Sequence, residues 1–88
     1  MRDSVRLAEV EILKYLLAHQ DARDTAEGIE KWWLPQSQPY GRADIDAALR
    51  DLEKLDLVRV WQPASALPIF GQGAAARETL ESYLRILE

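Results

Sequence analysis

The chain has 88 residues, of which 48% are hydrophobic and 30% are charged, as is typical of a folded soluble domain. A domain of this size has one core and no room for a deep catalytic cavity, which excludes a two-domain enzyme. It has no cysteine, which excludes disulfides and thiolate metal sites, and its formal charge of −4 is unlike that of a typical polyanion-binding protein.

The apolar residues form no long continuous segment. The longest uninterrupted apolar run is Tyr15 to Ala18, and no apolar signal segment follows the first charges. No internal repeat or linker-like stretch divides the chain. We therefore expect residues 1–88 to form a single domain that is cytoplasmic and has no membrane partner.

The first predicted helix begins with Ser4 as its N-cap and ends near His19, where the chain becomes polar. Its apolar residues fall on two stripes, so neighbouring elements are expected to cover the helix on two sides. The stripes are Val5, Ala8, Ile12 and Leu16 on one side and Val10, Leu13 and Leu17 on the other.

A second, short helix is predicted from Asp24 or Thr25 up to Pro35, which ends it. Asp24 and Glu27 have the spacing of a capping box. Adjacent helix positions cannot both face the core, so one of Trp32 and Trp33 is expected to be partly exposed. Residues 35–41, with two prolines and a glycine, predict an ordered loop.

The clearest 3.6-residue period predicts a helix over residues 42–55, with Ile45, Ala48, Leu49, Leu52 and Leu55 on one face. Asp56 follows at a position where left-handed backbone is common. Residues 57–61 and 67–70 predict a two-stranded hairpin, and residues 74–88 predict a last helix.

Residues 45–58, IDAALRDLEKLDLV, resemble the third helix and first wing strand of the winged helix-turn-helix superfamily, as in small bacterial regulators. The resemblance implies a mainly helical α+β fold with three helices, a two-stranded β-hairpin wing and a C-terminal helix. Three features depart from the family pattern. Asp56 replaces the usual glycine, the stretch 34–41 is longer than a simple turn, and the wing tip 62–67 contains no Lys or Arg.

The resemblance implies a DNA-binding transcription regulator that acts as a dimer on double-stranded DNA. The outermost line of the helix 42–55 would face the major groove of DNA. Arg42 would contact the DNA backbone at the edge of the groove, and one of the acidic side chains could accept a hydrogen bond from cytosine N4. The candidate DNA-binding residues are Arg42, Ala43, Asp46, Ala47, Arg50 and Lys54. Asp44, Asp46, Asp51 and Glu53 flank this line and oppose phosphate binding.

The alternative is a protein-interaction adaptor that uses the acidic third helix and the Trp/Pro loop 32–40, with Trp32, Trp33 and Tyr40 as partner-binding residues. A structural role, in which Trp33 and Tyr40 hold the loop on the body of the domain, is the favoured interpretation of these two residues. A homodimer would be built on Leu80, Tyr83, Leu84 and Leu87 of the last helix. The same stripe is also what a helix packed on its own chain would show.

We expect no enzymatic activity and no cofactor or metal. The chain has one histidine, His19, which lies where an imidazolium complements the dipole of the first helix. Residues 71–73, Gly-Gln-Gly, lack the third glycine and the buried strand of a phosphate-binding loop.

Overall fold

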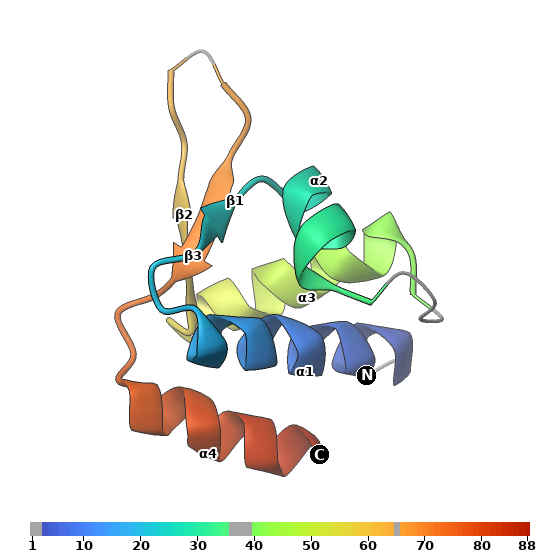
Figure 1. Ribbon diagram of the computed structural model, residues 1–88, viewed down its shortest axis with the longest axis vertical. Coiled ribbons are helices and arrows are strands. Elements are labelled where there is room, and N and C mark those ends of the chain that lie inside the picture. The colour runs from blue at the N-terminus through green and yellow to red at the C-terminus, as the bar shows by residue number, and fades with distance from the viewer. Residues whose placement is uncertain (1–2, 36–39, 65) are drawn as a thin grey trace.

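The protein has a mainly helical α+β fold in the computed structural model, which describes residues 3–35, 40–64 and 66–88 (Figure 1). The elements in chain order are α1 (Asp3–Ala18), β1 (Arg23–Asp24), α2 (Ala26–Gly28), the π-helix η1 (Ile29–Trp33), α3 (Arg42–Lys54), β2 (Val58–Trp61), β3 (Ile69–Gln72) and α4 (Arg77–Leu87). The predicted mainly helical α+β class is confirmed, and the order of elements is compatible with a winged-helix-like arrangement.

The first helix is central, as its two apolar stripes predict. α3 packs on one side of α1 and α4 runs antiparallel along another (Figure 1). Ile12, Leu13 and Leu16 are fully buried between them. The predicted start is wrong by a short distance, because Ser4 lies within the first turn of the helix rather than before it.

The second helix is capped by Thr25, whose hydroxyl accepts from the Gly28 amide at 3.1 Å. Asp24 belongs instead to strand β1, and its carboxylate accepts from the Thr25 amide at 2.8 Å. The predicted capping box between Asp24 and Glu27 is therefore wrong. Glu27 pairs with Lys31 one turn later, at 3.3 Å. The π-helix η1 ends before Pro35, in agreement with the expected steric block.

The third helix has the predicted bounds to within one residue and buries Ile45, Ala48, Leu49 and Leu52, largely against α1. The prediction for Leu55 is wrong: it follows the last residue of α3 and is 47% exposed. Asp56 then adopts left-handed backbone, with φ of 61°, as predicted. The turn brings Gly73 against the Asp56 carbonyl, where an added Cβ would overlap the oxygen. This close approach joins the end of α3 to the end of the hairpin.

The sheet has three antiparallel strands in the order β1-β3-β2, so the prediction of two strands was incomplete. β1 has only two residues, too few to show an alternating pattern. Strand β3 also continues to Gln72, past its predicted end. Side chains alternate along the hairpin, so Val58 reaches the core while Arg59 and Trp61 share the opposite, outer face.

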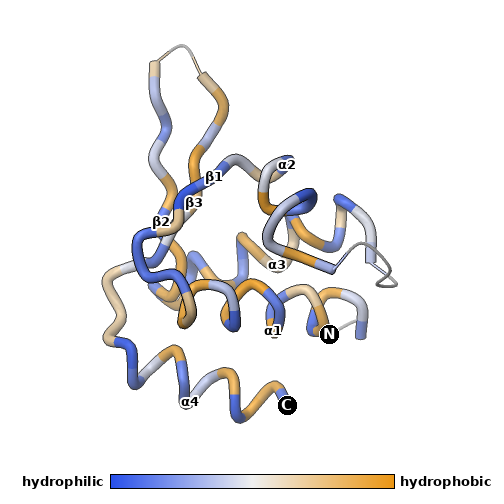
Figure 2. Tube along the Cα trace, viewed as in Figure 1, coloured by the Kyte–Doolittle hydropathy of each residue, from blue (hydrophilic) through white to orange (hydrophobic). Residues whose placement is uncertain are grey.

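The last helix closes the core on α1 and begins at Arg77, three residues later than predicted. Its apolar side faces α1 (Figure 2). The guanidinium of Arg77 donates to the Leu17 carbonyl at 2.9 Å, and that of Arg6 donates to the Leu87 carbonyl at 2.6 Å. These two contacts tie both ends of α4 to the first helix.

Candidate interaction surfaces

The outer line of α3 is the predicted DNA-binding ridge. Ala43, Arg50 and Lys54 are exposed, and neither cation has a carboxylate within ion-pair distance among residues 3–35, 40–64 and 66–88. Ala47 is half-buried and packs against the core. The ridge is therefore narrower than the sequence indicates, with its unpaired charges at the C-terminal half of the helix.

Arg42, at the N-terminal end of the same helix, is held between two carboxylates. Its guanidinium lies 3.4 Å from Glu30 of η1 and 3.5 Å from Asp46 of α3. These pairs are exposed and each contributes less than about 1 kcal/mol to stability. Among the described residues, the carboxylates of Glu30, Asp44 and Asp46 lie at this end of α3 with Arg42, which leaves an excess of negative charge there.

The aromatic residues of the stretch 32–40 separate into buried and exposed members. Trp33 is 7% exposed and stacks on Tyr15, with ring centroids 4.7 Å apart and planes 9° apart. Tyr40 is half-buried against the core, and burial raises the pKa of its hydroxyl to about 12. Trp32 is 75% exposed. Residues 36–39 of the predicted loop lie outside the described residues.

The stripe predicted for dimerisation packs within the chain. Leu80 and Leu87 are buried against α1, and Tyr83 and Leu84 are half-buried there. A dimer built on this stripe can use only Tyr83 and Leu84 without opening the core. The exposed apolar residue of α4 is Ile86, which is 74% exposed and was not singled out by the sequence.

The outer face of the hairpin carries a cluster that sequence reasoning missed. The guanidinium carbon of Arg23 lies 4.4 Å from the centroid of the Trp61 ring, and that of Arg59 lies 5.3 Å from it. A signal for two of its members is present in the sequence, because residues two apart in a strand, such as Arg59 and Trp61, have side chains on the same face. Arg23 could not be added from the sequence, because strand β1 was not predicted.

A carboxyl group is buried where three helices meet. Glu9 of α1 is fully buried, beside Asp51 of α3 and Tyr83 of α4, whose hydroxyl donates to Glu9 Oε1 at 3.5 Å. Burial, together with the nearby Asp51 carboxylate, raises the pKa of Glu9 to about 7. The sequence carries a signal for this group, since Glu9 lies between the two apolar stripes of the helix, one turn from Val5 of the first and one turn from Leu13 of the second.

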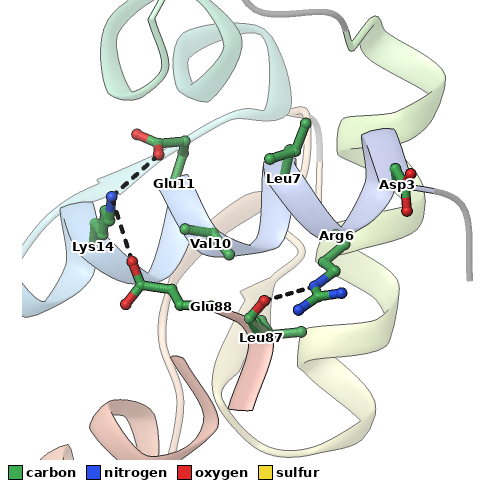
Figure 3. A pocket seen from close by; sticks show the side chains of 8 residues that line it. All are labelled: Asp3, Arg6, Leu7, Val10, Glu11, Lys14, Leu87 and Glu88. Atoms are coloured by element: carbon green, nitrogen blue, oxygen red, sulfur yellow. Dashed lines mark hydrogen bonds and ion pairs between the residues drawn. The ribbon is translucent and has the colours of Figure 1, made fainter. Parts of the chain in front are cut away.

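A groove of about 590 Å³ runs between α1 and the end of α4 (Figure 3). Lys14 pairs there with Glu11 at 3.6 Å and with Glu88 at 3.8 Å, while Arg6 is bonded to the Leu87 carbonyl. These cations are already used within the fold. Over the described ranges we find no cluster of side chains able to hold a metal ion, and no helix with the length and apolar character to cross a membrane.

Compared with protein-family models, curated proteins and solved structures, the chain matches none of them.

Proposed function

We propose that this chain is a non-enzymatic winged-helix module that binds a protein partner. The winged-helix assignment is supported by the order of α1 to α3, the hairpin β2–β3 and the closing helix α4. It is also supported by Asp56, which takes the left-handed conformation that the family usually gives to glycine. The partner-binding surface comprises the acidic beginning of α3 and Trp32 of η1.

The observation that carries this proposal is the position of Arg42 between Glu30 and Asp46. In helix-turn-helix proteins the N-terminal residues of the third helix approach the bases, and phosphates pass on either side. Here that end has an excess of negative charge, which opposes counterion release and favours a partner without phosphates. The ion pair between Glu30 and Arg42 also ties α3 to the element that carries Trp32.

Trp32 supplies the anchor expected of a protein interface. At 75% exposure its indole is mostly in water, whereas the adjacent Trp33 is in the core. Tryptophan is enriched among the few residues that dominate interface energies, because it buries a large area with little loss of conformational entropy.

DNA binding is the second candidate. It is favoured by Arg50 and Lys54 on the α3 ridge, which are exposed and pair with no carboxylate of the described residues. Two phosphate contacts predict a modest salt dependence. Their counterion release would lower the affinity about tenfold between roughly 50 and 200 mM salt.

Fluorescence anisotropy with a labelled random duplex separates the two candidates. We expect no binding at about 50 mM salt at micromolar protein. Micromolar binding that falls about tenfold at 200 mM salt, and that is lost in R50Q and K54Q, would overturn the proposal in favour of DNA.

Partner capture from a lysate tests the anchor, with Trp32→Ala compared with Ile86→Ala. The two residues have nearly equal exposure, 75% and 74%. We expect the captured protein to be lost from the Trp32 variant and retained by the Ile86 variant. Equal retention by both would exclude Trp32 as the anchor.

A further inference from the structure

We propose that the outer face of the hairpin binds an acidic segment of a partner protein through its carboxylates. This face, here called the Arg–Trp–Arg face, consists of Arg23, Arg59 and Trp61 over Gly71. It is a different surface from the beginning of α3 and Trp32. The inference therefore goes beyond the proposed function and does not depend on it.

The sheet register assembles the face from segments far apart in the sequence. Arg23 of β1 and Arg59 of β2 are both paired with Gly71 of the central strand β3. A Cβ at Gly71 would lie 3.0 Å from Trp61 Cζ3 and 3.1 Å from Arg23 Cγ. The missing side chain thus leaves the space in which the indole and the Arg23 stem lie across the strand.

Both positive charges of the face are without a carboxylate partner in the part of the chain that the structure describes. The carboxylate of Asp24, the nearest acidic neighbour in sequence to Arg23, accepts from the Thr25 amide. The two guanidinium carbons lie over one ring and are at most about 10 Å apart. An anion placed between them would relieve their mutual repulsion.

The chemistry of the guanidinium group favours carboxylates as that anion. Arginine presents a planar set of donors that matches a carboxylate with two parallel hydrogen bonds. Stacking on Trp61 restricts both arginines before the ligand arrives, which lowers the entropy lost on binding. Two such groups suit a segment with neighbouring acidic residues.

The surroundings favour a peptide over a nucleic acid. The cleft beside the face has a volume of about 410 Å³ and is lined by Arg23, Asp24, Thr25, Trp61 and Ile69, with the Asp24 carboxylate bonded to the Thr25 amide. Leu67, farther along the hairpin, is 63% exposed. A nucleic acid requires a continuous track of positive charge, and the wing tip 62–67 has no Lys or Arg to extend one. Two arginines and a tryptophan beside the exposed Leu67 match the residue types that are enriched in protein interfaces.

The test is an NMR titration of the full chain with hexaglutamate, following the indole N–H of Trp61 and the Nε–H of Arg23 and Arg59. We expect these signals to shift and the affinity to fall about tenfold in R23Q and in R59Q. Arg85→Gln is the matched control, because it removes one exposed charge from α4. We expect it to bind hexaglutamate as the wild type does.

Four outcomes would overturn the proposal. They are the absence of shifts at millimolar hexaglutamate, an equal loss of affinity in R85Q, tighter binding of oligothymidylate than of hexaglutamate, and equally tight binding of inorganic phosphate. Gly71→Ala provides a further check that keeps all charges. Where its amide spectrum shows a folded domain, the displaced ring should weaken hexaglutamate binding.

Discussion

Replacing Glu9 with glutamine tests the buried carboxyl group at the junction of α1, α3 and α4. Glutamine has nearly the same shape but never carries a charge. Glu9 Oε2 is buried and has no hydrogen-bond partner among the described residues. The neutral form is favoured in the folded state mainly because burial removes the carboxylate from water. The negative charge of Asp51 and a hydrogen bond from the protonated Glu9 carboxyl group to Asp51 add to this effect.

The pH dependence follows from the pKa of Glu9, which rises from 4.5 to about 7 on folding. The folded state keeps its proton to higher pH than the unfolded state does. The contribution of Glu9 to the free energy of unfolding is therefore complete below pH 4.5, and it is lost as the pH rises through 7. The full difference is about 3 kcal/mol, of which about 2 kcal/mol is lost between pH 5.5 and pH 8.

Urea denaturation followed by tryptophan fluorescence at about pH 5.5 and pH 8 measures this loss. We expect E9Q to equal or exceed the wild type at the lower pH and to exceed it by up to about 3 kcal/mol at the higher pH. All other titrating groups are common to both proteins and cancel in the comparison. Glu11→Gln, on the same helix but paired with Lys14 at its surface, should keep the wild-type dependence. The same pH slope in E9Q and the wild type would refute the reasoning.

Four further substitutions test the fold. Asp56→Gly should raise the free energy of unfolding by about 1 kcal/mol in urea denaturation, because glycine adopts φ of 61° without strain, and a loss of stability would contradict this. Gly73→Ala should lower it by about 1–3 kcal/mol, because the methyl group overlaps the Asp56 carbonyl; an unchanged denaturation midpoint would rule out the close approach. Trp33→Ala should lose about 3–5 kcal/mol in thermal melts followed by circular dichroism, and Trp32→Ala less than about 0.5 kcal/mol. Equal effects at the two positions would show that their burial is misassigned.

The elements with a strong local pattern were predictable from the sequence. The 3.6-residue period predicted α3 almost to the residue, and the two stripes of the first helix predicted its central position. Asp56 was predicted to be left-handed because the chain must turn sharply between a helix and a strand. In each case residues close in sequence determine the conformation, since their spacing sets which side chains share a face.

Only the tertiary structure decided which charges are neutralised and which aromatic residues are exposed. The sequence shows Arg42 as a cation of the α3 ridge, whereas folding places Glu30 of η1 against it. The sequence also shows two adjacent tryptophans without indicating which is buried. In the folded protein Trp33 stacks on Tyr15 in the core and Trp32 is exposed. The Arg–Trp–Arg face exists only because β3 brings β1 beside the hairpin. The reason is physical: electrostatic and stacking contacts act over a few ångströms in space, and here the partners are separated along the chain by 12 residues or more.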